Sequence, residues 1–250
     1  MPTTRLQRTA GVAALLALTA GPAVAQDSGW TFDLTGYLWV NDTGVTADTP
    51  FGEASAELSF SDALDALDFA YMGMVEARNG PWGAIGDLLY FKLSAGGPTP
   101  NGALFSKVEA KSEITVVSTY LTYRVHEDAN VAFDIGAGLR AFWTSVDTKL
   151  VGTGGNPTRD FGHDKDWVDP VLAARLSMAF NEKWFGTLTL DAGGTGDTSS
   201  WQALATVGYR LNQKWTLQGG YRYLEAEWDT DYGKASLDFS GPIIGATYRF

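Results

Sequence analysis

The feature that most constrains this fold is a two-residue alternation of apolar and polar side chains, repeated in segments of about ten residues. The last such segment, residues 237–250, shows the alternation most clearly. One side of the extended chain carries Pro242, Ile244, Ala246, Tyr248 and Phe250, and the other carries Gly241, Gly245, Thr247 and Arg249. A strand with one oily face and one small or polar face suits a wall between lipid and a polar interior.

The same alternation predicts nine further strands. They occupy residues 30–40, 69–78, 82–93, 115–125, 131–145, 167–180, 184–192, 201–211 and 215–228. Short turns at 79–80, 126–130, 181–183 and 212–214 alternate with long connections at 41–67, 94–105, 149–166, 193–200 and 229–235. Short turns at one end and long loops at the other are typical of a membrane barrel.

We therefore expect an all-β chain, with a single antiparallel transmembrane up-and-down β-barrel over residues 26–250 and ten strands. The last strand is expected to pair with residues 30–40 and close the barrel. Eight strands is the alternative if one of them has been split, and twelve if residues 53–59 form a hairpin of their own. Within the long 41–67 connection, residues 61–67 predict two helical turns with Ser61 as the cap.

Composition excludes several classes of protein. No apolar run after residue 25 approaches the roughly 20 residues of a spanning helix, so membrane residence requires a barrel. The chain has no Cys, which rules out disulfides and thiolate chemistry. A net charge of −11 disfavours nucleic acid as a partner.

The first 25 residues resemble a secretory signal peptide. Arg5 and Arg8 precede an apolar run over residues 10–20, and small residues at Ala23 and Ala25 suit a signal peptidase. We predict cleavage after Ala25. An anchoring helix is the alternative, and the shortness of the run argues against it.

The nine Trp residues are placed near the predicted strand ends. Those expected at the short-turn end are Trp30, Trp82, Trp184 and Trp215, and those expected at the opposite end are Trp39, Trp143, Trp167, Trp201 and Trp228. Because indole favours the headgroup region, this spacing predicts two interfacial belts. Scattered core Trp residues or a sugar-binding platform are the alternatives.

These features resemble those of bacterial outer-membrane β-barrel proteins. The ending with Gly245, Tyr248 and Phe250 resembles the C-terminal signal that the barrel-assembly machinery reads in that family. The size is similar to the small OmpA-type and OmpW-like barrels. The resemblance implies residence in the outer membrane of a Gram-negative bacterium, contact with lipid and lipopolysaccharide, and a monomer.

Charged residues gather on the predicted inward faces. The acids are Asp33, Glu76, Asp87, Asp134 and Asp169, and the bases are Arg78, Arg124, Arg140, Arg175, Arg210, Arg222 and Arg249. Guanidinium forks cross-link carboxylates and carbonyls in a confined interior, so we expect a charge network that largely plugs the lumen. A basic eyelet that passes small anions is the alternative.

Candidates for catalysis or metal binding are few. His126 lies in a predicted short turn, and His163 lies in a predicted external loop beside Asp164 and Asp166. No acidic segment has the spacing of a calcium loop, so we expect no metal and no cofactor. The expected role is structural or surface-interacting and not enzymatic. The alternatives are a narrow, porin-like diffusion channel for small solutes and an outer-face lipid or peptide hydrolase that uses His163.

Overall fold

The computed structural model describes residues 29–50, 52–98 and 105–250. The predicted signal peptide, residues 1–25, lies outside the described residues. The elements in chain order are β1 (Trp30–Trp39), β2 (Asp42–Thr49), β3 (Gly52–Leu58), α1 (Phe60–Ala66), β4 (Leu67–Asn79), β5 (Trp82–Pro98), β6 (Phe105–Glu127), β7 (Val131–Gly152), β8 (Arg159–Ala179), β9 (Trp184–Gly194), β10 (Thr198–Arg210), β11 (Trp215–Thr230) and β12 (Gly233–Arg249).

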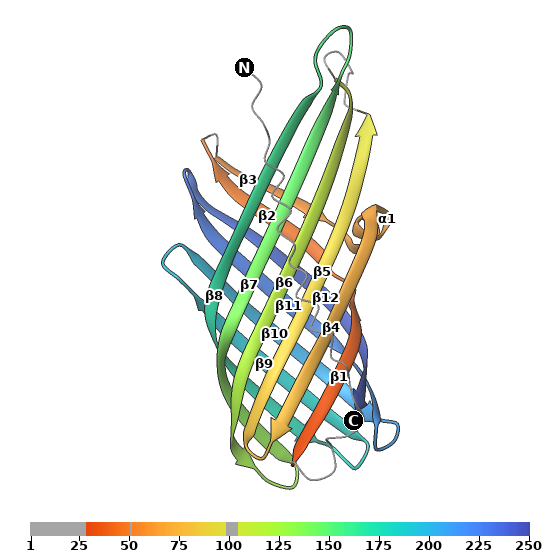
Figure 1. Ribbon diagram of the computed structural model, residues 1–250, viewed down its shortest axis with the longest axis vertical. Coiled ribbons are helices and arrows are strands. Elements are labelled where there is room, and N and C mark those ends of the chain that lie inside the picture. The colour runs from red at the N-terminus through yellow and green to blue at the C-terminus, as the bar shows by residue number, and fades with distance from the viewer. Residues whose placement is uncertain (1–28, 51, 99–104) are drawn as a thin grey trace.

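The strands form one closed antiparallel barrel (Figure 1). Ten strands surround the lumen, because β1 pairs with β4, β4 to β12 pair in sequence, and β12 returns to β1. In the closing pair Asp33 lies opposite Arg249, and Trp39 lies opposite Ile243. The predicted all-β fold, the strand count and the closure of the last strand onto the first are confirmed.

The connection over residues 41–67 is more ordered than we expected. β2 continues along β12 above β1, with Asp42 opposite Ser240, and β3 folds back onto β2. The helix begins at Phe60 with Ser59 as its cap, not Ser61, because the Ser59 hydroxyl accepts the Asp62 backbone N–H at 3.3 Å. The hairpin therefore adds two strands to the sheet without adding to the barrel circumference. Among the described residues no helix is long and apolar enough to cross a bilayer.

Most of the predicted long loops are strand extensions. β6, β7 and β8 contain 23, 22 and 21 residues and reach well above the other hairpins in Figure 1. The predictions for 94–105 and 149–166 are wrong over much of their length, since β5 runs to Pro98, β7 runs to Gly152 and β8 starts at Arg159. The 193–200 and 229–235 connections are likewise shorter than predicted, with β10 starting at Thr198 and β12 at Gly233. Above the apolar wall both faces are polar, so alternation no longer marks the strand although its backbone hydrogen bonds continue.

The short turns are confirmed, and three of them share one device. In each turn an Asx side chain accepts backbone N–H groups at the start of the next strand. The acceptors are Asp128, Asn181 and Asn212, with all six N···O distances between 2.8 and 2.9 Å. The N–H groups of Asn130 and Val131 hold the pKa of the Asp128 carboxyl below its usual value. In the fourth turn Gly80 has φ +53°, a left-handed conformation that favours glycine.

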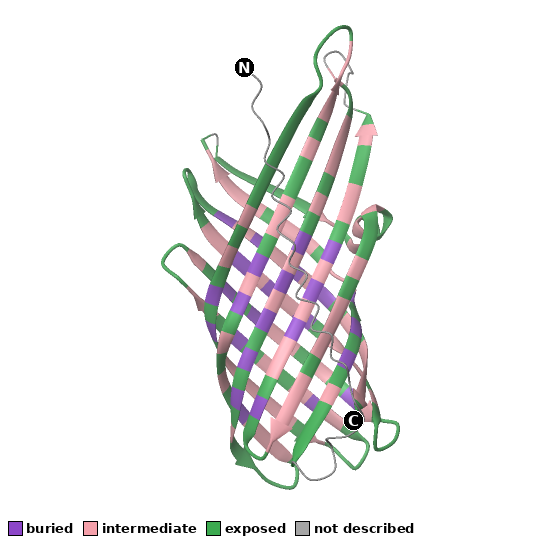
Figure 2. Ribbon diagram, viewed as in Figure 1, coloured by how far each residue is buried: buried purple, intermediate pink, exposed green. Residues whose placement is uncertain are grey.

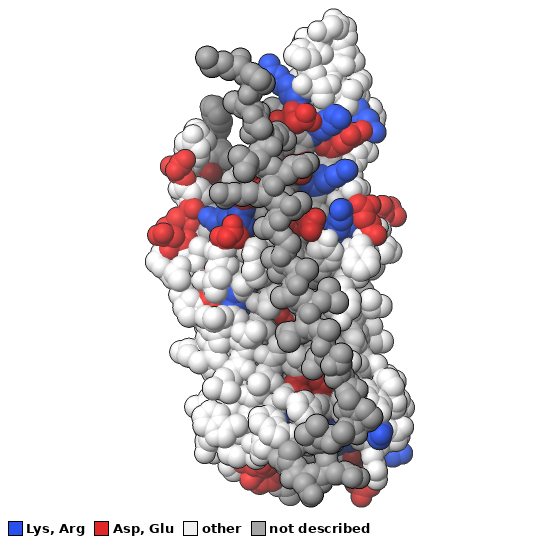
Figure 3. Space-filling model, in the orientation of Figure 1, with Lys and Arg blue, Asp and Glu red and all other residues white. Residues whose placement is uncertain are grey.

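Along the strands in the middle of the barrel, more buried residues alternate with more exposed ones (Figure 2), as expected where successive side chains point to the lumen and to the outer wall. Outward residues include Leu38, Leu172 and Ile244, which are 67%, 71% and 64% exposed. On the face shown in Figure 3, charged side chains gather over the upper part and at the lower end, with a largely uncharged band between. This band has the character of a surface that faces hydrocarbon. The buried apolar side chains lie inside the barrel.

Tight contact between neighbouring strands predicts an effect of substitution at Gly138. A Cβ there would overlap the backbone oxygen of Thr119, whereas a Cβ at Gly36 would meet nothing within 4 Å. We expect Gly138→Ala to lower the free energy of unfolding by about 1–3 kcal/mol through overpacking. Urea titration of refolded protein, with Gly36→Ala as the matched control, measures it. Equal unfolding midpoints for the two variants would contradict the close approach.

Candidate functional site

The lumen contains a polar cavity at the end that carries the short turns. Its volume is about 730 Å³, and its lining includes Thr35, Gln218 and Thr247 beside Arg249 and turn residue Lys214. Cations and carboxylates alternate around this cavity. The arrangement offers a wet polar vestibule and no hydrophobic pocket for a drug-sized ligand.

Ion pairs line this cavity on the side formed by β12, β1, β4, β6, β7 and β8. Arg249 grips Asp33 through two bonds of 2.7 and 2.6 Å, directly across the closing strand pair. One connected cluster joins β4, β6, β7 and β8: Glu76 pairs with Arg175 at 2.7 Å and Arg78 at 3.3 Å, and Asp134 pairs with Arg78 at 3.0 Å and Arg124 at 2.9 Å. Each carboxylate thus links two strands that are not consecutive in the chain. Asp33 links β1 to β12, Glu76 links β4 to β8, and Asp134 links β7 to β4.

A second charged layer lies deeper and is almost fully buried. Arg222, 1% exposed, donates to Asp87 at 2.6 Å and to Gln202 at 2.8 Å. The Tyr37 hydroxyl accepts from Arg222 at 2.8 Å and itself donates to Asp87. The guanidinium also lies 4.9 Å from the ring of Trp39. Charge, hydrogen bonding and a cation–π contact therefore all hold one side chain.

Arg140 forms the other half of this layer. It is fully buried and donates to Asp191 at 2.6 Å, to Tyr120 at 2.8 Å and to Ser118 at 3.0 Å. Gln202 joins the halves, because its amide donates to Asp191 at 2.9 Å while its carbonyl accepts from Arg222. We call these residues the buried polar layer: Tyr37, Asp87, Ser118, Tyr120, Arg140, Asp191, Gln202 and Arg222. It links β1, β5, β6, β7, β9, β10 and β11.

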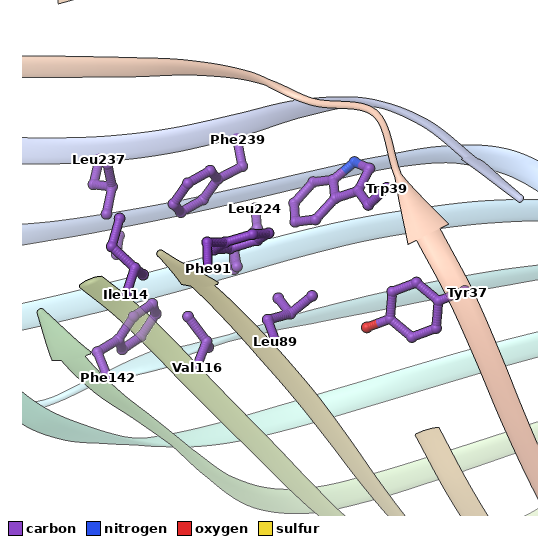
Figure 4. Close-up of a cluster of buried hydrophobic side chains, with 11 residues drawn as sticks. Tyr37, Trp39, Leu89, Phe91, Ile114, Val116, Phe142, Leu224, Leu237 and Phe239 are labelled. Atoms are coloured by element: carbon purple, nitrogen blue, oxygen red, sulfur yellow. The ribbon is translucent and has the colours of Figure 1, made fainter. Parts of the chain in front are cut away.

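An apolar layer lies one inward position farther along the strands than the buried polar layer, and Figure 4 shows its side chains clustered inside the barrel. Its members are Trp39, Leu89, Phe91, Ile114, Val116, Phe142, Leu224, Ala226, Leu237 and Phe239, with Trp167 and Trp228 packed against them. Phe142 stacks on Trp167 at 4.5 Å, and Trp167 lies 5.4 Å from Trp228. Along its axis the lumen therefore changes from a solvent-accessible, charged region to a buried, apolar region.

The apolar layer corrects the predicted Trp belts. Trp39, Trp167 and Trp228 were expected at the membrane surface, but they lie inside the barrel, with Trp39 only 3% exposed. Their inward direction follows from strand parity, since Trp39 shares a face with Tyr37 and Trp167 shares a face with Asp169. Position at a strand end does not determine the side from which the indole projects.

The other six Trp residues point outward, and four of them pack on a Tyr of the adjacent strand. The ring distances are 4.9 Å for Trp82 and Tyr123, 4.8 Å for Trp184 and Tyr209, 4.7 Å for Trp201 and Tyr223, and 5.0 Å for Trp215 and Tyr248. Trp30 stacks on Phe32, and Trp143 is 40% exposed. Tyr248 also touches Phe250, so the chain end joins this outer aromatic surface.

Two predicted members of the charge network lie outside the ion pairs. Asp169 is fully buried but accepts from Thr198 at 2.6 Å and Trp167 at 3.3 Å instead of pairing with Arg140. Arg210 donates to the Glu182 carbonyl at 3.1 Å and lies over the Phe185 ring. Within the described residues no carboxylate lies within 4.0 Å of the Arg210 guanidinium.

Sequence reasoning missed Asp191, Gln202, Tyr37 and Tyr120 as partners. Asp191 was detectable, because it alternates with Leu188 and Leu190 in β9 and so belongs to the inward face. The neutral partners carry no such signal, since an inward Tyr or Gln is indistinguishable from ordinary lumen filling until its neighbours are known.

Neither His residue lines the polar cavity or belongs to the buried polar layer. His126 contacts Asp128 at 3.2 Å beside a short turn. His163 is exposed on the extended part of β8, opposite Val146, and no hydrogen bond links it to a Ser or Asp of the described chain. In the described part of the chain no group of three His, Asp or Glu side chains has metal-binding geometry.

The buried polar layer predicts a large cost for removing one Arg. Arg140→Ala leaves Asp191 buried without its cation, so we expect a loss of about 3–5 kcal/mol in the free energy of unfolding. Lys234→Ala is the control, because its 3.4 Å pair with Glu227 is exposed and is worth about 0–1 kcal/mol. Urea unfolding midpoints of refolded protein measure both. Similar midpoints would show that the buried pair adds nothing.

Comparison with known proteins gives matches only among solved structures, and these are distant. No protein-family model and no curated protein matches this chain. Its fold is similar to that of the outer membrane protease OmpT from Escherichia coli, with 8% identity over 88% of this chain and 96% of that chain and a TM-score of 0.46. Ail, the attachment invasion locus protein of Yersinia pestis, has 14% identity over 89% and 99% with a TM-score of 0.31, and Neisserial surface protein A has 14% over 89% and 98% with 0.33. The solved structures that this chain resembles are bacterial outer-membrane β-barrels, the class that the sequence predicts, and the likeness concerns the fold alone.

Proposed function

We propose that this protein resides in the bacterial outer membrane as a monomeric structural or surface-interaction barrel whose lumen is closed to solutes. The observation that carries the proposal is the buried polar layer, in which Arg140 and Arg222 are 0% and 1% exposed. A hydrated ion would have to break charge-assisted bonds in a medium of low dielectric to pass this level. It would then meet the apolar layer, where nothing replaces its water.

The residence rests on the barrel and its outer wall. The ten-stranded sheet closes on itself and pairs the backbone polar groups along most of its wall, as a bilayer requires. The exposed side chains of the wall are apolar, and the aromatic pairs described above lie among them. We propose lipid and lipopolysaccharide as its surroundings and the barrel-assembly machinery as its assembly partner, with no cofactor, metal or nucleic acid.

A surface role is supported by the projecting part of β5 to β8. β8 pairs with β9 only from Val171 onward, so its segment from Arg159 to Pro170 presents one strand edge without a partner among the described strands. Exposed Asp160, Asp164 and Asp166 line that segment. Charges on a free edge discourage self-association while leaving the backbone available to a specific partner.

A narrow diffusion channel is the second candidate. The polar cavity of about 730 Å³ favours it, because solvent enters deep into the barrel from the short-turn end. For this candidate the two layers above the cavity must open. Outer-face hydrolysis through His163 has no comparable support, and we do not propose catalysis.

Single-channel recording separates the two candidates. We expect refolded protein in a planar bilayer to show no steady openings. Replacing the stacked pair Phe142 and Trp167 by Ala removes part of the apolar layer but leaves the buried polar layer in place, so we expect this variant to stay silent, like the outer-wall control Trp201→Ala. Steady openings of the unsubstituted protein would establish the channel instead, and steady openings of the double variant alone would show that the apolar layer, and not the buried polar layer, closes the lumen.

Deletion of Phe250 tests the proposed assembly signal of Gly245, Tyr248 and Phe250. The Phe250 backbone N–H donates to Phe32 at 3.0 Å, and its ring packs on Tyr248, so the deletion removes both a closing bond and an aromatic contact. We expect a several-fold loss of protein in the outer-membrane fraction, with folding followed by the gel shift between unboiled and boiled samples. Phe180→Ala, which removes an exposed aromatic at the β8 to β9 turn, is the control. Unchanged assembly without Phe250 would contradict the signal.

A further inference from the structure

The barrel wall is interrupted beside β1. β1 and β4 pair from Trp30 opposite Asn79 up to Gly36 opposite Gly73, and no further. Above that level the Trp39 backbone N–H points at the Met72 sulfur, 3.3 Å away, instead of a backbone carbonyl. Sulfur is a weak acceptor, so this contact does not replace a ladder hydrogen bond.

The upper part of the interruption has two unpaired edges. β12 pairs with β2, and β2 pairs with β3, so the far edge of β3 has no strand partner among the described residues. The edge of β4 from Leu67 to Met72 likewise lacks a strand partner on this side. We call the space between these edges the seam, and α1 lies across it.

An apolar pocket leads from the seam to the apolar layer. Its inner wall contains Trp39, Phe91, Ile114 and Phe239, and its outer wall contains Phe60 and Leu64 of α1. No Lys, Arg, Asp or Glu lines it, and its volume is about 70 Å³. A cavity of about 150 Å³ lined by such side chains stays dry and accepts benzene, so this narrower one suits the end of a single hydrocarbon chain.

The helix that covers the pocket is held weakly. None of its residues is buried, and Leu64 remains 54% exposed although it lines the pocket. A seven-residue helix also has little stability of its own. The cover can therefore move without breaking the ladder of the barrel.

The seam opens at the upper margin of the apolar wall. Below and beside it the outward residues are Leu38, Phe69 and Tyr71, which are 67%, 56% and 54% exposed. Above it the outward face of the β2 and β3 hairpin carries Asp48 and Glu57. The medium against this margin is the outer leaflet, at the depth where acyl chains leave their head groups.

We infer that the pocket accepts one acyl chain of an outer-leaflet lipid, which enters through the seam while its head group stays outside. The absence of lining charges excludes a buried head group or carboxylate, because a charge there would lose its hydration without a partner. Aliphatic carbon instead gains contact with the apolar layer. This inference rests on the proposed residence in the outer membrane.

Photolabelling of the refolded protein in phospholipid vesicles tests this occupant. The probe is a phospholipid with a diazirine at the end of one acyl chain, and mass spectrometry locates the labelled residues. We expect labels on outward Leu188 and Leu190, which any lipid reaches, and also on Met72, Phe91 and Ile114, which line the pocket.

Two matched variants link the pocket labels to the cavity. Ala63→Trp fills the pocket from α1 and should abolish labelling of Ile114, whereas Ala205→Trp places the same bulk on the outer wall and should leave it unchanged. Leu64→Gln makes the lining polar without altering a strand, and should also reduce the pocket labels. The gel shift on boiling verifies that each variant is folded.

The outcomes separate this inference from the proposed residence. Absence of label on the outer wall refutes membrane insertion itself. Outer-wall label without pocket label refutes the acyl site alone, as does pocket label that persists in Ala63→Trp. A further experiment uses a free fatty acid that carries a diazirine, with the protein in detergent. If the pocket is labelled only in that experiment, the occupant is a free fatty acid from the medium and the inference of a membrane lipid is wrong.

Discussion

The rest of the structure depends on two guanidinium–carboxylate pairs buried at one level of the lumen. Arg140 with Asp191, and Arg222 with Asp87, lie in a medium where an unpaired charge is prohibitive, so each pair requires its partner strand at one register. Gln202 makes the pairs interdependent, because its two ends bond to one member of each. A one-residue slip of any of these strands would turn its charged member toward the outer wall. The layer thus acts against wrong registers as much as in favour of the right one.

The segregation of the lumen follows from the same constraint. A guanidinium offers five donors. All three nitrogens of Arg222 donate to Gln202, Tyr37 or Asp87, and Arg140 donates from Nε and Nη2 to Ser118, Tyr120 and Asp191 while its Nη1 has no partner. Large apolar side chains can then close over the layer, because few polar groups remain to be hydrated. The inward Trp residues contribute to both layers, since Trp39 faces Arg222 and also packs on Phe239 at 5.9 Å. On the short-turn side the ion pairs stay partly exposed, and water screens them.

The sequence predicted the barrel strands well, but it predicted the hairpin above them and the pairing of the lumen charges less well. Alternation and turn residues located all ten barrel strands, because lipid outside and polar groups inside impose opposite demands on successive residues. The pattern failed above the apolar wall, where lipid no longer faces the strands. In β2, Thr43 and Ala47 face inward and Asp48 faces outward, and this contrast is too weak to distinguish a strand from a loop. The network was foreseen as Arg–carboxylate pairs, but the sequence did not show which residues pair. Partners such as Asp87 and Arg222 are 135 residues apart and meet only through the curvature of the barrel.

The position of the seam follows because one edge of a strand can pair with only one neighbouring strand at each residue. β12 is long enough to pair with β1 along its lower half and with β2 along its upper half, so the chain bends at Val40 and leaves β4 without a partner on its β1 side above Gly73. The pocket behind this break is lined by members of the apolar layer and by no member of the buried polar layer. Motion of α1 therefore uncovers Phe91 and Ile114 while Arg222 and Asp87 stay closed beneath them. A break one layer lower would expose paired charges to hydrocarbon, which is far more costly than exposing carbon to carbon. The side of the barrel can therefore open at α1 while the buried Arg–Asp pairs that fix the strand register stay intact.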